Sequence, residues 1–428
     1  MTHPPAALDL PTQQEAPLRS ARPLVWVVLR SITVASVSIV LALVILSDTL
    51  RAYADIIGAP HSIALWDFKL FYSGDLDFFA GGSLYRPSAV LPFPRISISP
   101  NNNSPVGALI FLPFSRLPLP VAALAWESGS LLLLLVALGY MGRLLRCPQQ
   151  WWWRALLVVC VYASFPITDA LWLGTWGMVI AALDIMAWYC ARQGAQRRAG
   201  IFLGIALALR WQPLVILLYM IAQRRWRVVA YTLVTGAVCS AGACVVFGVR
   251  SFVEFARMVE TSSTGGAGDP YDGTVRAALG RLIGAWPHTD PHLVALIAQG
   301  GLLSALGLLA LTLWRGRSVG FDVGFSLSIV CGFLVVPMSW MHYDMALLLP
   351  MAVVAQRRAW PALCVGLFWL SVKPLSLDTT MPPVVFGTIL TVSLVVLYAS
   401  LWRQSLPRHV TQHLLVPTSD GGRRATPA

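Results

Sequence analysis

The chain has 428 residues, of which 57% are hydrophobic and only 12% are charged, and its mean hydropathy is +0.69. This composition excludes a soluble globular domain and predicts an all-α protein, a polytopic bundle of transmembrane helices. The formal net charge of +12 is distributed as short basic turns between apolar segments. Such a pattern reflects membrane topology and does not indicate a nucleic-acid partner.

The first expected element is a transmembrane helix over residues 23–48, preceded by a polar cytoplasmic tail over 1–22. The tail contains acidic as well as basic residues. The apolar core is also longer than the roughly 7–15 residues of a signal-peptide h-region, so we expect an uncleaved anchor. A long polar loop over 49–103 follows on the outer side.

Within this loop, aromatic residues recur at helical spacing after Asp67, until Gly81 and Gly82 stop the pattern. We expect an amphipathic helix that lies on the membrane surface. Asp67 is placed either to cap this helix or to act on a substrate at the membrane surface. Asp75 and Asp77 leave a metal-binding role open, although no strong carboxylate cluster favours one.

A short apolar segment over 104–118 comes next, and we interpret it as a half-helix that lines a cavity. Three consecutive amides stand at its mouth: Asn101, Asn102 and Asn103. Amides suit hydrogen bonding to hydroxyl groups of a substrate, but this run is equally suited to a turn and a helix cap.

We expect about ten membrane crossings with both termini in the cytoplasm, because this topology places all the basic turns on the cytoplasmic side. After the first, they are expected at 121–143, 154–167, 175–191, 228–248, 293–314, 321–336, 343–356, 359–371 and 383–402. A second polar tail covers 403–428. The cytoplasmic turns are too short to hold a nucleotide-binding domain, and no Gly-rich phosphate loop occurs.

Another apolar segment, 200–222, is interrupted at Arg210 and is also expected to form half-helices. A guanidinium inside an apolar segment is costly unless it faces water, an acid or an anionic ligand. A phosphate group would satisfy it well. The alternative is an internal ion pair with Asp184 or Glu127.

The later outer segments carry further candidates. Trp340 and His342 follow one another in the stretch 337–344, where an imidazole beside an aromatic ring suits contact with a phosphate or a sugar. A simple connecting turn is the alternative. Arg276 and Lys373 are basic residues near the outer surface.

The seven cysteines all lie outside the outer loops and are interpreted as small packing residues.

Four short elements together carry a resemblance to a known family. They are Asp67-Phe-x-x-Phe-Tyr, Ala80–Tyr85, Gly204–Pro213 and Pro337–His342. Their order and shared outer placement resemble glycosyltransferase family 87, integral-membrane enzymes of the GT-C fold similar to polyprenol-phosphate-mannose-dependent mannosyltransferases. The resemblance covers most of 23–402 and implies one catalytic domain there.

The resemblance implies transfer of a sugar, mannose in the family, from a polyprenyl-phosphate donor to a lipid or glycan hydroxyl. Direct attack on the anomeric carbon would invert its configuration and requires one base. The active site would lie on the extracytoplasmic face of the inner (plasma) membrane, with no cofactor or metal. It implies Asp67 as general base, His342 near the donor phosphate or the reacting hydroxyl, and Arg210 as a phosphate partner. The other expected substrate contacts are Tyr72, Tyr85, Asn101, Asn102, Asn103, Arg276, Trp340 and Lys373.

The chain departs from the family pattern in two places. A Gly-Gln-x-Asn element appears as Gly174–Gly177 without the amides, and a loop that often contains Asn-Gln-Ser has Asp272–Thr274. These departures leave the identities of the sugar and the acceptor open.

A transporter or flippase of a lipid-linked saccharide is the main alternative function, followed by a non-catalytic assembly partner. The long acidic outer loop and the lack of an obvious internal repeat favour the enzyme.

Overall fold

A computed structural model of the chain describes residues 65–85, 103–145, 161, 164–265, 271–284, 291–336, 339–356, 362, 365–366, 369 and 383–404. Within these ranges the secondary structure is helical, apart from an isolated β-bridge between Asp272 and Trp340. The all-helical class is thereby confirmed. The first expected crossing, most of 154–167 and 359–371, and nearly all of both tails lie outside the described residues.

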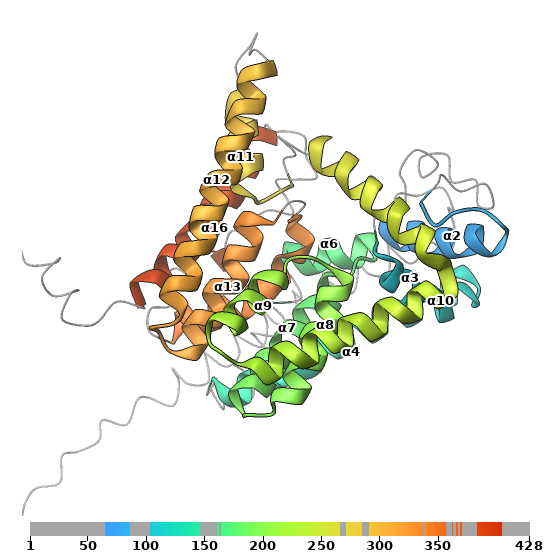
Figure 1. The fold of residues 1–428 in the computed structure, drawn as a ribbon, viewed down its shortest axis with the longest axis horizontal. Coiled ribbons are helices and arrows are strands. Elements are labelled where there is room, and N and C mark those ends of the chain that lie inside the picture. Colours follow the sequence, from blue (N-terminus) through green and yellow to red (C-terminus); the bar gives the residue numbers. More distant parts are fainter. Residues whose placement is uncertain are drawn as a thin grey trace, which may run out of the picture.

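The described helices are shown in Figure 1. In chain order they are α2 (Trp66–Phe79), α3 (Pro105–Ser115), α4 (Leu119–Leu144), α6 (Phe165–Leu173), α7 (Gly177–Arg192), α8 (Gln196–Leu209), α9 (Leu214–Ala222), α10 (Trp226–Gly265), α11 (Val275–Gly284), α12 (Pro291–Gly316), α13 (Phe321–Val335), the 3₁₀ helix η2 (Met341–Leu347), α14 (Leu348–Ala355) and α16 (Pro383–Gln404).

One half of the bundle is built from α4, α7, α8 and α10, each packed on the next. The α8–α10 contact depends on two glycines four residues apart. A Cβ atom at Gly200 would lie 2.6 Å from the Val228 carbonyl oxygen, and one at Gly204 would lie 2.7 Å from that of Thr232. Small residues at this spacing allow two helix backbones to approach closely, as they do in membrane proteins.

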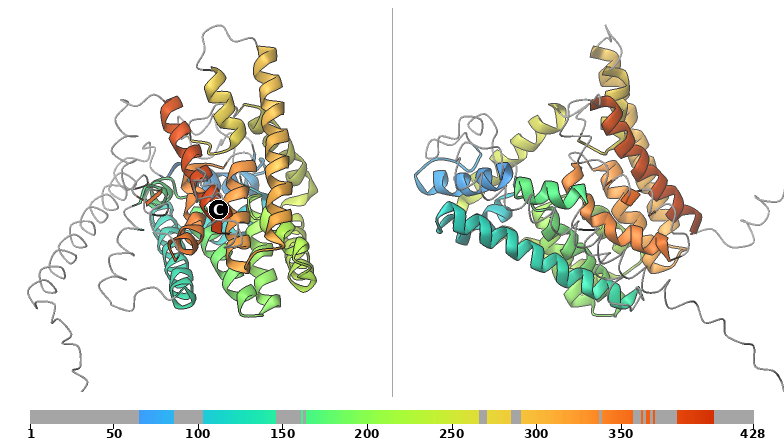
Figure 2. Two further views of the ribbon diagram at one scale, coloured as in Figure 1. Left: turned by 90° about the vertical axis from the view of Figure 1, so that its left-hand side faces the viewer. Right: turned by 180° about the vertical axis from the view of Figure 1, so that it is seen from behind.

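The other half contains α11, α12, α13 and α16, the orange and red helices of Figure 2. Two short elements connect the two halves: helix α9 packs on α10, α12 and α13, and η2 packs on α6, α7 and α13. The short helix α14 packs on α13, α16 and η2. Residues that are far apart in sequence therefore meet around η2.

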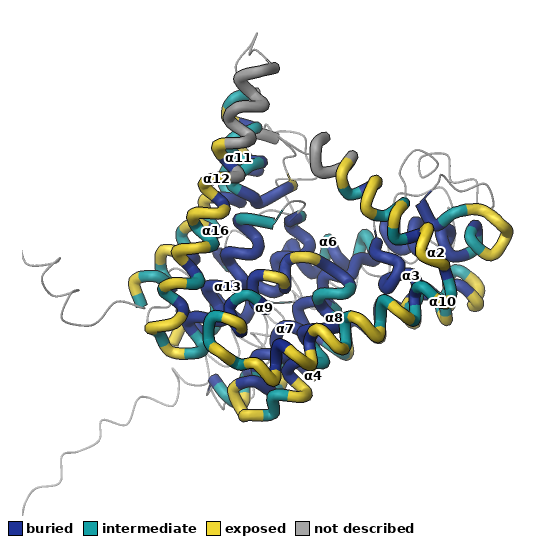
Figure 3. Tube along the Cα trace, viewed as in Figure 1, coloured by how far each residue is buried: buried dark blue, intermediate teal, exposed yellow. Residues whose placement is uncertain are grey.

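The surface of the bundle is strongly apolar. Helices α4 and α10 include Leu119–Leu144 and Trp226–Glu260, which within the described residues are long and apolar enough to cross a membrane. Val238 on α10 is 66% exposed and Val245 is 86% exposed, and Figure 3 shows the exposed outer side of this helix in yellow. Contiguous exposed apolar residues are rare on soluble proteins, so this side fits contact with lipid.

The basic connections meet at one end of the bundle. Arg225 donates from Nη1 to the Ala191 carbonyl oxygen at 2.8 Å, and Arg192 forms an ion pair with Asp322 at 3.2 Å. Further contacts at this end join Gln356 to Leu145, Arg315 to Trp402, and Gln404 to Val354. The ends of α4, α7, α9, α12, α14 and α16 therefore lie together, as the charge pattern predicts.

The expected break in segment 200–222 is confirmed, because α8 ends at Leu209 and α9 begins at Leu214. Two segments between the expected crossings contain helix. Residues 168–173 belong to α6, whose C-cap is the left-handed Gly174 (φ 70°). The helix expected at 228–248 continues to Gly265, with a kink at Gly248 that its positive φ of 75° permits.

The expectation of a surface-lying helix after Asp67 was also wrong. Helix α2 forms, but most of its residues are buried, including the charged Asp67, Asp75 and Asp77. It packs against α3 and α6, and the Phe68 ring contacts that of Phe111 on α3 at a centroid distance of 5.0 Å. Helix α3, the first expected half-helix, covers the side of α2 that was expected to face the bilayer.

Candidate active site

Asp67 is positioned by the junction of α2 with α6. Leu65 precedes α2 in a left-handed conformation (φ 57°), and its amide donates to the Trp172 carbonyl oxygen at 2.6 Å. A Cβ atom at Gly174 would lie 2.5 Å from the Phe68 Cβ atom, so the glycine allows the two helices to touch. Leu65 occupies the N-cap, so Asp67 lies in the first turn of α2 and does not fill the capping position.

The Asp67 carboxyl is buried beside a guanidinium and an imidazole. Its exposed fraction is 6%, and Oδ2 has no hydrogen-bond partner among the described residues. Burial raises the pKa of Asp67, whereas the charges of His342 and Arg210 lower it and that of Asp169 raises it. A carboxyl whose pKa is raised by burial, beside groups that oppose the rise, suits proton abstraction from a hydroxyl.

Arg210 lies in the break between α8 and α9, where the backbone is extended (φ −147°, ψ 159°). It is 7% exposed. One guanidinium nitrogen donates to the Tyr343 hydroxyl, and the Cζ atom lies 4.4 Å from the centroid of the Tyr343 ring and 6.0 Å from that of Trp340. Aromatic faces stabilise a desolvated cation in this arrangement.

The alternative partners of Arg210 lie elsewhere. Glu127 and Asp184 are buried on α4 and α7, and the ion pairs found among the described residues do not join either to Arg210. Neither Glu127 carboxyl oxygen has a hydrogen-bond partner there. Arg210 is therefore part of the group around Asp67.

His342 is held by the backbone of η2. The preceding Trp340 forms the β-bridge with Asp272, and the Gly273 amide donates to the Ser339 carbonyl oxygen at 3.1 Å. Gly177 at the start of α7 packs directly on the His342 carbonyl oxygen, so a Cβ atom there would overlap it. The imidazole itself lies between the rings of Trp340 and Tyr343, at centroid distances of 5.7 and 4.5 Å.

The site thus combines residues from four separate parts of the chain. Asp67 comes from α2, Asp169 from α6, Arg210 from the α8–α9 break and His342 from η2. His342 Nδ1 lies 3.4 Å from Asp169 Oδ2. In this arrangement the carboxyl can accept a proton from a hydroxyl, while the guanidinium and the imidazole can stabilise a departing phosphate.

Comparison with known proteins agrees with this chemistry. The model of "Glycosyltransferase family 87" matches residues 102–339, which is more than half of the chain. The chain belongs to glycosyltransferase family 87. It is therefore a glycosyltransferase, as its four sequence elements predict. No solved structure gives a significant match.

Several curated relatives of this family 87 enzyme come from mycobacteria. It is 28% identical over 324 residues, 71% of the chain and 73% of the relative, to a polyprenol-phosphate-mannose-dependent alpha-(1-2)-phosphatidylinositol mannoside mannosyltransferase of Mycobacterium tuberculosis. The Mycolicibacterium smegmatis protein of the same name is 28% identical over 68% of the chain and 70% of its own length. A pentamannoside mannosyltransferase of M. tuberculosis is 22% identical over 67% of the chain and 65% of its own length.

Two predicted contacts of the glycosyltransferase, Tyr72 and Tyr85, lie on α2 and just beyond its end. The Tyr72 hydroxyl donates to the Leu117 carbonyl oxygen at 2.7 Å, and its ring stacks on Phe68. The Tyr85 hydroxyl donates to the carbonyl oxygen of the buried Asn103 at 2.8 Å. These hydroxyls are engaged in packing the helices around the site.

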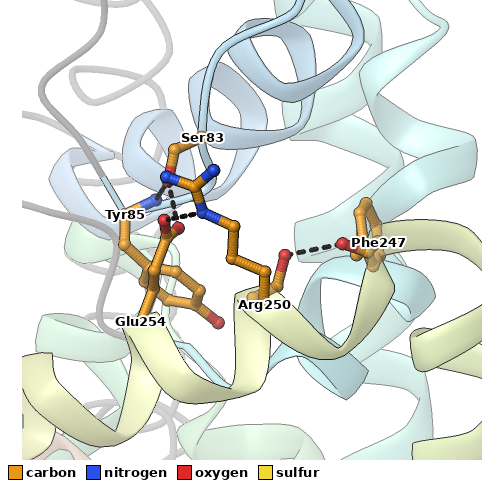
Figure 4. A network of polar contacts seen from close by, with 6 residues as sticks. Ser83, Tyr85, Phe247, Arg250 and Glu254 are labelled. Carbon is orange, nitrogen blue, oxygen red and sulfur yellow. Dashed lines mark hydrogen bonds and ion pairs between the residues drawn. The ribbon is translucent and has the colours of Figure 1, made fainter.

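The loop that carries Tyr85 is fixed to α10 by a polar network (Figure 4). Ser83 Oγ donates to Glu254 at 2.6 Å and accepts from the Tyr85 amide at 3.1 Å, while Arg250 Nε donates to Glu254 at 2.9 Å. The network holds the end of α2 against the second half of α10.

Three predicted contacts of the glycosyltransferase, Asn101, Asn102 and Lys373, lie outside the described residues. Arg276 is half-buried on α11, which packs on α12 and α16.

Two residues of the site, Asp169 and Tyr343, were missed by sequence reasoning. Asp169 is the only acid in an otherwise apolar segment, and an acid in such a place is a functional candidate in a membrane protein. Tyr343 directly follows His342. Within the described residues, no group of three or more His, Cys, Asp and Glu side chains is placed to hold a metal ion.

Proposed function

We propose that this glycosyltransferase moves mannose from a polyprenyl-phosphate donor to a hydroxyl of a lipid or glycan acceptor. The meeting of Asp67, Arg210 and His342 carries this proposal, because the three come from distant segments and are buried together at one place. The printed names of the relatives support the donor, since the four curated relatives found are polyprenol-phosphate-mannose-dependent. The phosphatidylinositol mannosides in those names support a glycolipid acceptor.

The proposed reaction is a single displacement at the anomeric carbon. The acceptor hydroxyl oxygen forms the new bond to that carbon while the bond to the donor phosphate oxygen breaks. Asp67 takes the hydroxyl proton, and the leaving phosphate departs with the bonding electrons beside Arg210 and His342. Attack opposite the leaving group inverts the anomeric configuration, which requires one base and no covalent intermediate.

The proposed location is the outer face of the inner (plasma) membrane. The Arg-bearing turns gather at one end of the bundle, whereas Asp67, Gly177 and His342 lie at the start of α7, away from the Arg192 end of the same helix. With the basic end in the cytoplasm, the site opens outward. About ten crossings in a GT-C-like arrangement over 23–402, flanked by the two tails, complete this proposal.

The donor is tested with purified protein in lipid vesicles that contain a membrane extract as a source of acceptors. Radiolabelled polyprenyl-phosphate mannose should pass its label to a lipid or glycan product, and a nucleotide-linked mannose should not. The anomeric configuration of the product, measured by NMR, should be opposite to that of the donor. Failure of transfer from every polyprenyl-phosphate sugar, together with movement of the lipid-linked sugar across the vesicle, would favour the flippase.

A further inference from the structure

The two ring nitrogens of His342 have different surroundings. Nδ1 lies 3.4 Å from Asp169 Oδ2. Nε2 is buried and has no hydrogen-bond partner among the described residues. Since the two nitrogens are on opposite sides of the imidazole, one side is paired with a carboxylate and the other is left available in a buried position.

Asp169 reaches His342 from a separate helix. It lies on α6, which packs on both η2 and α2. Its side chain is 21% exposed, whereas that of His342 is 8% exposed. The distance of 3.4 Å is that of an ion pair and exceeds a normal hydrogen bond, and such distances in catalytic sites often shorten when substrate binds. A small movement of either side chain would bring the two atoms into a direct hydrogen bond.

We propose that Asp169 is a positioning residue for His342, an inference that rests on the proposed function. Asp169 holds the His342 imidazole with a proton on Nδ1 and thereby directs Nε2–H toward the leaving phosphate. A carboxylate on one ring nitrogen of a histidine fixes its orientation and tautomer, and it stabilises the protonated ring. The protonated ring presents Nε2 as a donor. The phosphate of the donor lipid is the acceptor that would need it.

The other charges around His342 fit this assignment. Asp67 faces the site from α2 and Arg210 from the α8–α9 break, while Tyr343 follows on η2 and accepts from Arg210. Among these, Asp169 is the acid that pairs with the imidazole. Asp67 is thereby left to react with the acceptor hydroxyl, so the two carboxylates have separate tasks.

A double-mutant cycle of Asp169 and His342 distinguishes a positioning role of Asp169 from a purely structural one. Asp169→Asn keeps the size of the side chain and removes its charge, so it tests positioning without leaving a cavity. Asp169→Glu retains the charge. Asp322→Asn is the matched control, because Asp322 also pairs with a cation, Arg192, but at the basic end of the bundle.

In the mannose-transfer assay, Asp169→Asn should lower kcat by at least about tenfold with KM for the donor nearly unchanged. Asp169→Glu should recover part of that loss, and Asp322→Asn should keep wild-type activity. In a His342→Gln background, Asp169→Asn should cost less than about threefold, because the group that it positions is gone. Thermal unfolding confirms that each variant is folded.

Three results would overturn the inference: wild-type kcat in Asp169→Asn, an equal loss in the wild-type and His342→Gln backgrounds, or no recovery in Asp169→Glu. Asp67→Asn is measured beside them. Inactive Asp67→Asn with active Asp169→Asn removes this inference alone, whereas fully active Asp67→Asn removes the proposed general base.

Discussion

Asp67 is buried, and Arg210 and His342 lie close enough to act on its carboxyl. Burial raises its pKa, while His342 and Arg210 oppose the rise. A proton acceptor in water at the usual carboxylate pKa would be a weak base, and a buried one without cations would remain protonated. The residues around Asp67 therefore determine whether it can take a proton from a hydroxyl.

Replacing Arg210 should change the pH dependence of transfer. The acidic limb of kcat/KM reports the carboxyl that must be ionised in the free enzyme. Arg210→Gln removes a cation that lowers the Asp67 pKa, so the pKa rises further and the limb should move to higher pH, by about one unit. Arg250→Gln, on the exposed side of α10, is the control. An unchanged limb in Arg210→Gln would mean that the two charges do not interact.

Asp75 should make the protein less stable as pH rises from about 4 to about 8. Burial raises its pKa to about 8, with Ser115 and Arg116 opposing, whereas a carboxyl of the unfolded chain titrates near about 4. Between these values the folded protein retains a proton that the unfolded chain has released, so the free energy of unfolding falls as pH rises.

Asp75→Asn removes that dependence. At pH 8 the variant should exceed wild type in the free energy of unfolding by on the order of a few kcal/mol, and the difference should shrink toward pH 4. Thermal unfolding in detergent across this range measures it. An advantage of equal size at both ends of the range would point to a cause other than titration.

Residue types and order predicted part of the site. The structure brings Asp67, Arg210, Trp340 and His342 together, as expected from their outer placement. Asp169 was missed although it is a lone acid in an apolar segment, and its pairing with His342 could not be predicted, because no local pattern encodes a contact between residues so far apart.

At the scale of elements, the helix breaks were more predictable than the packing. Arg210-Trp211-Gln212-Pro213 interrupts an apolar run, and both the charge and the proline disfavour a continuous helix. The burial of α2 could not be predicted, because its aromatic residues suit a lipid surface as well as a protein interior. Contact with α3 and α6 decides between them.

Gly177 should be essential for the position of η2. A Cβ atom there would overlap the His342 carbonyl oxygen and lie 2.6 Å from Met345 Cε. Gly177→Ala should therefore displace His342, lowering the rate of transfer by at least about tenfold and the free energy of unfolding by about 1–3 kcal/mol.

Gly129 on α4 is the matched control for Gly177. A Cβ atom at Gly129 would have no heavy atom of a neighbouring element within 4 Å. Gly129→Ala should therefore retain activity and stability. Initial rates and thermal midpoints measure both variants. Equal rates and equal thermal midpoints of the two variants would show that the close packing of Gly177 on η2 is not required for transfer or stability.

At the scale of the whole molecule, the basic turns and the site lie at different places in the bundle. The charge pattern predicted this separation, because positively charged connections remain in the cytoplasm irrespective of how the helices pack. The order in which the helices pack was not predictable, since lipid-facing and buried helices have similar compositions.

Cysteine labelling in intact cells tests the orientation. Tyr271 and Gln193 are both exposed, one beside the site and one in a basic turn. A membrane-impermeant maleimide should label Tyr271→Cys in intact cells and Gln193→Cys only after permeabilisation, with the wild-type chain as background. The reverse pattern would place the site in the cytoplasm.

The most direct test of Asp67 as the base compares mannose transfer by two variants, Asp67→Asn and Asp75→Asn. Each replaces one buried acid of α2 by its amide. Because Asp67 takes the acceptor proton, its replacement should lower the rate of transfer from polyprenyl-phosphate mannose by at least about a hundredfold. Asp75→Asn should stay within about threefold of wild type. Equal rates in wild type and Asp67→Asn would contradict the assignment of Asp67 as the base.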